Sequence, residues 1–306
     1  MFNSAIGPLD GDTWEGFIQA VFKKKYDSYR EIMTSSGDLG INGGVLHEGI
    51  LIQCYCPEEN YDINTLHQKQ IDKITGDINK IIQYGGDIAK CFGEHKVSQW
   101  LFITPKIAHV GIHTHGQIKA LEIKKAGLSF IADDFEVVID DLGTYIQDIR
   151  AIQVLNGSQL SFSSTSGAVI TEPELKTEYD DNINEKNKIR SIIKEMYKPS
   201  VHDRLNELTK KYYLNGYNIL RRIFNESPEL YERIAKLVNN FEDEVEVLSS
   251  TWESTHQDLI AGVEEKLMAR FSKDQYISAI EYEDLISITK HMIARWIAEC
   301  PMRIEE

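Results

Sequence analysis

Several polar side chains in the first third of the sequence have the types and spacing that metal-dependent cleavage of a phosphodiester bond requires. That chemistry uses carboxylates to hold one or two Mg²⁺ ions, and commonly a lysine to activate the attacking water or to stabilise charge. The chain offers Glu15, Asp38, Asn42, Gln53 and Tyr55 as candidate catalytic residues. Because Gln53 and Tyr55 are two positions apart, a strand directs both to the same face.

These segments resemble a known family. The runs WEGFI (14–18), GDLGING (37–43) and IQCYCP (52–57) are similar to the helix glutamate, the GDxGxDG turn and the QxK strand of PD-(D/E)XK nucleases of the Mrr-like restriction type. Most similar are variants in which QxK becomes Q-x-Y followed by proline, as in effector subunits of ABC-three-component (Lamassu-type) antiphage systems. The run SQWLFIT (98–104) lies where that fold has a further strand.

The resemblance covers roughly residues 10 to 145 and implies a fold, a reaction and partners. The implied fold is an α/β restriction-endonuclease-like domain, with a mixed central sheet flanked by helices. Glu15, Asp38 and Gln53 would hold Mg²⁺ or Mn²⁺, Asn42 would hold the turn or a metal-bound water, and Tyr55 would orient the nucleophile. The implied function is a DNA endonuclease of a bacterial antiphage defence complex, controlled by an SMC-like ABC ATPase together with a further subunit.

Two departures from the family pattern leave an alternative open. Asn42 stands where the family has an aspartate, and a neutral amide coordinates divalent ions poorly. Tyr55 stands where the family has lysine, and a phenol with a reference pKa of about 10 is a poor substitute for a cation. Lys73 or Lys69, on the helix that follows, could supply the positive charge. Otherwise the domain is a catalytically degenerate adaptor that binds partner proteins or DNA without cleaving.

The elements that position these residues alternate between helices and short buried strands. Apolar residues at helical spacing predict a helix after Thr13, which is the expected N-cap, and further helices over 62–82 and 114–126. Apolar runs predict strands over 49–57, 100–103 and 137–139. This alternation favours an α/β domain with a mixed sheet.

The length of 306 residues predicts two domains. We expect the nuclease-like domain over 1–155, a Ser-, Gly- and Asn-rich linker over 156–187, and a helical domain over 188–306. The helical domain is similar in pattern to the C-terminal domains of the same effectors, and this resemblance implies that it docks on the ATPase partner. Residues 158–171 could instead form a hairpin. In the last segment Ser200 and Asp203 predict a capping box, Ser227 caps the next helix, and further helices are expected over 252–271 and 282–298.

The net charge of −15 limits what the chain binds alone. Both halves are net negative, whereas nucleic-acid affinity depends largely on Lys and Arg side chains that neutralise phosphates. We therefore expect a partner to supply most of the affinity for DNA. No signal sequence or membrane-spanning run is visible, which predicts a cytoplasmic protein with reduced cysteines and no membrane partner. A homo-oligomer is possible. His109, His113 and His115 could suggest zinc, but a solvated loop is favoured.

Overall fold

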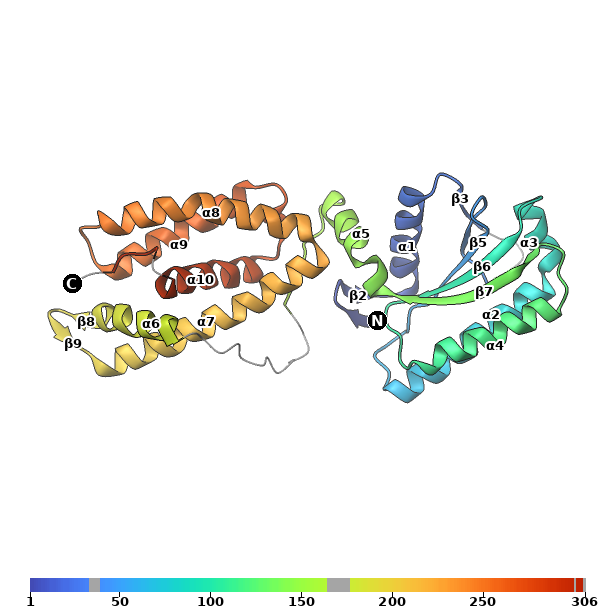
Figure 1. Cartoon of the computed structure of the whole chain (residues 1–306), viewed down its shortest axis with the longest axis horizontal. Coiled ribbons are helices and arrows are strands. Elements are labelled where there is room, and N and C mark those ends of the chain that lie inside the picture. Colours follow the sequence, from blue (N-terminus) through green and yellow to red (C-terminus); the bar gives the residue numbers. More distant parts are fainter. Residues whose placement is uncertain (33–38, 164–176, 300, 305–306) are drawn as a thin grey trace. The chain divides into compact units, whose positions relative to one another are not determined.

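The chain folds into two units, Met1–Ile152 and Gln153–Glu306. The computed structural model describes residues 1–32, 39–163, 177–299 and 301–304. The first unit is mixed α/β with a central sheet, and the second is helical (Figure 1). The prediction of a mixed sheet flanked by helices, followed by a helical region, is confirmed at this level.

The central sheet contains five strands in the order β3 (Tyr29–Glu31), β4 (Gly43–Val45), β5 (Ile50–Cys54), β6 (Val97–Thr104) and β7 (Ile131–Asp141). The first three pair antiparallel, whereas β5, β6 and β7 run parallel. A separate hairpin of β1 (Phe2–Ser4) and β2 (Gly7–Leu9) precedes them. The predicted strands correspond to β5, β6 and β7, and the helices between the parallel strands provide the crossovers that such pairing needs.

Helices cover both faces of the sheet (Figure 1). Residues of α1 (Gly11–Lys25) and α5 (Leu142–Leu155) share one apolar core, and those of α2 (Ile63–Gln83), α3 (Gly85–Phe92) and α4 (Gly111–Lys125) share another. The pleat of β5 divides its side chains between the two. Ile52 and Cys54 belong to the α1 side, whereas Leu51 and Tyr55 belong to the α2 side.

The predicted helix boundaries hold to within about three residues, except at the start of the helix predicted over 252–271, which begins at His256. The expected N-cap Thr13 is wrong, because Asp10 caps α1 by accepting a hydrogen bond from the backbone N of Thr13 at 2.9 Å. The predicted capping box at Ser200 is also wrong. That helix begins at Pro199 without a side-chain cap, since proline at the first position has no N–H to satisfy.

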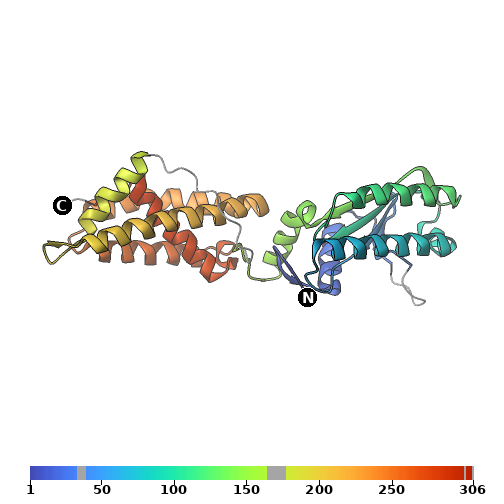
Figure 2. The same ribbon diagram turned by 90° about the horizontal axis from the view of Figure 1, so that it is seen from below.

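The second unit is a helical bundle around its last helix (Figure 2). It contains α6 (Thr177–Arg190), α7 (Pro199–Glu226), α8 (Pro228–Ser250), α9 (His256–Lys273) and α10 (Tyr282–Ala298), with a small hairpin of β8 (Ile192–Ile193) and β9 (Met196–Tyr197). Buried residues occur on nearly every side of α10, so the other helices surround it. Within the described ranges, no helix combines the length and the apolar character needed to cross a membrane.

Part of the predicted linker over 156–187 belongs to the helical unit. Leu160, Phe162 and Ile183 are buried in its core. Asp284, which is fully buried at the start of α10, accepts hydrogen bonds from the backbone N of Phe162 at 2.6 Å and of Ser163 at 3.2 Å. The polar composition of this segment concealed its few apolar anchors. The alternative hairpin over 158–171 falls mostly outside the described residues.

Helices α7 and α10 approach each other closely at Gly216. A Cβ atom on this glycine would lie 2.0 Å from Cβ of His291. The imidazole is buried, and its Nδ1 lies 2.6 Å from the backbone oxygen of Tyr213, to which it donates. Burial lowers the pKa of His291 to about 4; the hydrogen bond to the Tyr213 backbone and the charge of Glu299 oppose this effect, whereas the charge of Arg295 adds to it.

The low pKa of His291 predicts acid sensitivity of the helical unit. Between an ordinary value of 6.5 and about 4, the unfolded chain binds a proton that the folded imidazole does not, so stability falls as pH falls. The loss should reach about 3 kcal/mol by pH 4. We expect urea unfolding to show this loss to be smaller in His291→Gln than in the wild type. The exposed-site control His113→Gln should lose as much stability with falling pH as the wild type does. An equal loss in all three proteins would contradict this assignment.

Candidate functional site

Asn42 joins the helix glutamate to the central sheet. Its Nδ2 donates to Glu15 Oε2 at 2.7 Å, and its Oδ1 accepts from the backbone N of Cys54 at 2.7 Å. The other carboxylate oxygen of Glu15 accepts from Nε2 of Gln19 at 2.7 Å. Both ends of the Asn42 amide are therefore occupied in linking α1 to β5, and both oxygens of Glu15 receive an amide donor.

Glu15 lies on the α1 side of the sheet, as its electrostatic neighbours indicate. Burial raises the pKa of the Cys54 thiol, and the negative charge of Glu15 adds to that effect. Burial likewise raises the pKa of Tyr29, with further contributions from Cys54, Glu31 and Glu15. The carboxylate thus faces groups that stay neutral at physiological pH.

Gln53 and Tyr55 lie on the strand face opposite Cys54, whose thiol pKa the charge of Glu15 helps to raise. The Gln53 side chain is 3% exposed, and its Nε2 donates to the backbone oxygen of Cys54 at 3.3 Å. Its Oε1 is buried and has no hydrogen-bond partner in the described part of the chain. A buried acceptor without a hydrogen bond lowers the stability of the fold by about 1–3 kcal/mol. Amides with a purely structural role usually have both ends hydrogen-bonded.

Tyr55 packs as an aromatic residue. Its ring stacks on Phe102 with centroids 5.8 Å apart. Burial raises the pKa of Tyr55 to about 12, with smaller contributions from Tyr61, Glu58 and Cys56. The phenol therefore remains protonated at neutral pH and does not replace the positive charge of a lysine.

The two lysines considered as replacements have other neighbours. Lys73 Nζ lies 3.0 Å from Oδ1 of Asp77, a fully buried carboxylate that also pairs with Lys80 at 3.3 Å. Lys69 Nζ lies 4.6 Å from the centroid of the Tyr61 ring. Gly40 packs against the same part of α2, where a Cβ atom would come within 2.5 Å of the Asp77 backbone oxygen. Lys73 and Asp77 thus form part of the support for the turn that precedes β4.

The Mg²⁺ site that the resemblance implies would take its ligands from Glu15, Asp38 and Gln53. Glu15 and Gln53 offer oxygen donors of suitable chemistry. However, the Gln53 side chain leaves β5 on the α2 side of the sheet, whereas Glu15 belongs to α1 on the other side. No group of three His, Cys, Asp or Glu side chains in the described ranges is arranged to hold a metal ion. Asp38, the third expected ligand, lies outside the described residues. Mg²⁺ binding therefore stays a prediction.

Two buried polar residues of α2 were not singled out as functional. Gln70 donates to the Lys106 backbone oxygen at 2.7 Å and accepts from the Ala108 backbone N at 3.2 Å. It fixes the loop between β6 and α4. Asp77 supports the turn that precedes β4. The available signal was their position, since both interrupt the apolar stripe of α2 formed by Leu66, Ile74 and Ile78.

The three histidines before and within α4 do not converge. His109 accepts from the backbone N of Gly111 at 3.0 Å and thereby satisfies one N–H at the start of the helix. His115 Nε2 lies 3.0 Å from Oγ1 of Thr75, and burial, followed by Lys119, lowers the pKa of His115. His113 is exposed. These roles are structural.

Comparisons with protein-family models, with curated proteins and with solved structures give no match. The fold and the site define the class only as a two-unit protein that joins a mixed α/β unit to a helical bundle.

Proposed function

We propose that this chain is a nuclease-like adaptor subunit of an antiphage defence complex, and that it binds an SMC-like ABC ATPase rather than cleaving DNA itself. The observation that carries the proposal is the bridge made by Asn42. At the position where the resembling nucleases have a metal-binding aspartate, this chain has an amide whose two ends hold Glu15 and the backbone of Cys54. The substitution converts a ligand position into a structural link.

The acidic charge agrees with an adaptor. A net charge of −15 disfavours strong autonomous DNA binding, because the 48 acidic side chains outnumber the 33 Lys and Arg that could neutralise phosphates. In the proposed complex the ATPase and a further subunit provide the contact with DNA. The helical unit provides the contact with the ATPase.

The β8–β9 hairpin supplies a surface for that contact. Its four strand residues, Ile192, Ile193, Met196 and Tyr197, are large, apolar and 43–56% exposed. Its two turn residues, Lys194 and Glu195, have positive φ values of 50° and 62°, which are uncommon for residues other than glycine. An exposed apolar cluster on a strained turn is typical of an interaction site.

Charge substitutions on this hairpin should prevent assembly. We expect wild-type chain and an SMC-like ABC ATPase from the same organism, when co-expressed, to elute together in gel filtration. The double variant Ile193→Glu and Met196→Glu should elute separately with an unchanged melting temperature. The matched control is Val247→Glu, which charges another exposed apolar residue, 63% exposed on α8. Co-elution of the hairpin variant would remove this surface from the proposal.

Gln53 favours a second candidate, the Mg²⁺-dependent DNA endonuclease. The unpartnered Oε1 of a buried amide is what a ligand to a metal or to an ordered water would leave when that group is absent. Glu15 and Gln53 would then contribute to cleavage of the phosphodiester bond.

Plasmid cleavage by the assembled complex distinguishes the two candidates. For an adaptor, any Mg²⁺-dependent cleavage should be the same in the wild type, Glu15→Ala and Gln53→Ala. The exposed residues Glu94 and Gln83 provide matched alanine controls. Loss of cleavage in both site variants but in neither control would replace the adaptor proposal with the nuclease.

A further inference from the structure

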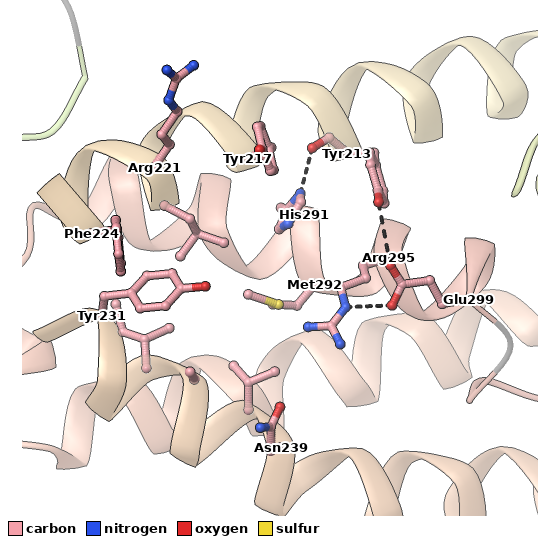
Figure 3. Close-up of a pocket in the computed structure, with 14 residues that line it drawn as sticks. Tyr213, Tyr217, Arg221, Phe224, Tyr231, Asn239, His291, Met292, Arg295 and Glu299 are labelled. Carbon is pink, nitrogen blue, oxygen red and sulfur yellow. Dashed lines mark hydrogen bonds and ion pairs between the residues drawn. The ribbon is translucent and has the colours of Figure 1, made fainter. Parts of the chain in front are cut away.

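The helical unit contains a cavity of about 540 Å³ between α7, α8 and α10 (Figure 3). This volume is within the usual range of small-molecule sites, roughly 300–1,000 Å³. It lies in a different unit from the Glu15–Asn42 link, and nothing in the proposed adaptor function uses it.

Aromatic rings form much of the cavity wall. Tyr217 and Phe224 come from α7 and are 48% and 55% exposed, which is high for residues of their size. Phe224 meets Tyr231 of α8 edge to face, with ring centroids 5.3 Å apart. Exposed ring faces beside a cavity can stack on a planar ligand such as a nucleic-acid base.

The interior offers both hydrogen-bond acceptors and donors. Because His291 is neutral and donates through Nδ1 to Tyr213, its Nε2 carries a lone pair. The Tyr231 hydroxyl points into the cavity (Figure 3) and has no partner among the described residues. Arg295 is held by Glu299, with Nε 2.7 Å from Oε2, and one of its terminal nitrogens lies 3.7 Å from Oε2 of Glu242. Asn239 adds an amide at the edge.

A cation lies at the rim. Arg221 is exposed, and among the described residues it forms no ion pair. Its guanidinium points away from the cavity (Figure 3), but rotation about its side-chain bonds can bring it over the mouth. Arg295, the other cation of the lining, is ion-paired with both Glu299 and Glu242, so Arg221 is the lining cation that can pair with an anionic ligand.

From this arrangement we infer that the cavity binds a nucleotide, with its base among Tyr217, Phe224 and Tyr231 and its phosphate at Arg221. A base has a flat face for stacking and an edge with both donors and acceptors, which matches His291, Tyr231 and Asn239. A simple aromatic carboxylate has no donor for the His291 lone pair, so it would leave that acceptor unmatched. The helical unit therefore binds a nucleotide in addition to docking on the proposed partner.

Isothermal titration of the full chain tests this inference. The probes are AMP, GMP, CMP and UMP, with the matching nucleoside and inorganic phosphate as separate arms. We expect at least one nucleotide to bind with a stoichiometry of one. Arg221→Ala should weaken that nucleotide by about tenfold, the loss of one charged hydrogen bond, and leave the nucleoside unchanged. Tyr231→Phe should weaken both several-fold.

Matched controls are available on the same helical unit. Arg204 is an exposed arginine near the start of α7, and Tyr276 is a tyrosine outside the cavity, so Arg204→Ala and Tyr276→Phe should bind as the wild type does. Thermal unfolding verifies that each variant is folded. Absence of saturable binding by all four nucleotides, or equal weakening by the controls, overturns the inference. So does phosphate binding as tightly as the nucleotide, which indicates a bare anion site.

Discussion

Replacing Gly216 with alanine is expected to lower the free energy of unfolding of the helical unit by about 3 kcal/mol, at the upper end of overpacking effects. The new Cβ would meet Cβ and Cγ of His291 at 2.0 and 2.6 Å. Neither atom is at the flexible end of a side chain, and both are fixed by the backbone of α10. The two helices must therefore separate, which opens the core around α10.

The matched control is Gly262→Ala in α9. A Cβ at this helical position has only Cη2 of Trp252 within 4 Å, at 3.6 Å. This substitution should raise stability by about 0.5–1 kcal/mol, because alanine loses less backbone entropy than glycine in a helix. Urea unfolding followed by circular dichroism measures both effects. Equal effects of the two substitutions would mean that α7 and α10 are not packed this closely.

Replacing Asn42 with aspartate should destabilise the first unit by about 2–3 kcal/mol in buffer without divalent ions. The change removes the donor to Glu15 Oε2 and places two carboxylates at the former 2.7 Å contact. The backbone N of Cys54 still has an oxygen to which it can donate. Two adjacent carboxylates raise the pKa of one of them, so the loss should diminish as pH falls through that raised pKa.

Mg²⁺ separates the variant from the wild type. For an adaptor, the melting temperature of the wild type should not change with Mg²⁺, whereas the paired carboxylates of Asn42→Asp should bind the ion and recover several degrees. The exposed control Asn64→Asp should remain within about 0.5 kcal/mol of the wild type and show no response. A Mg²⁺-dependent rise in the wild type would favour the endonuclease instead.

Periodicity predicted the long elements because their apolar faces are regular. The spacing of Leu66, Ile74 and Ile78 led directly to α2, and the pattern over 282–298 matches α10 to the residue. Short elements lack such a repeat. The β8–β9 hairpin is closed by Lys194 and Glu195 in conformations that those residue types rarely adopt, so no turn signal was available.

The candidate site was harder to predict, because it depends on which helix covers which face of the sheet. Alternation correctly gave Gln53 and Tyr55 a common side, but it cannot say that α1 covers the other side. The link from Glu15 through Asn42 joins residues 27 positions apart. It depends on side-chain geometry that composition and spacing do not encode.

The central position of α10 also sets the order in which the chain can mature during synthesis. The described residues of the first unit supply its central sheet and the helices that pack on it, so that unit can fold while the ribosome is still translating the remainder. The bundle cannot close until residues 282–298 have emerged, since they supply its middle. Nascent chains that stall before this point would expose the apolar faces of α7, α8 and α9 to chaperones and proteases.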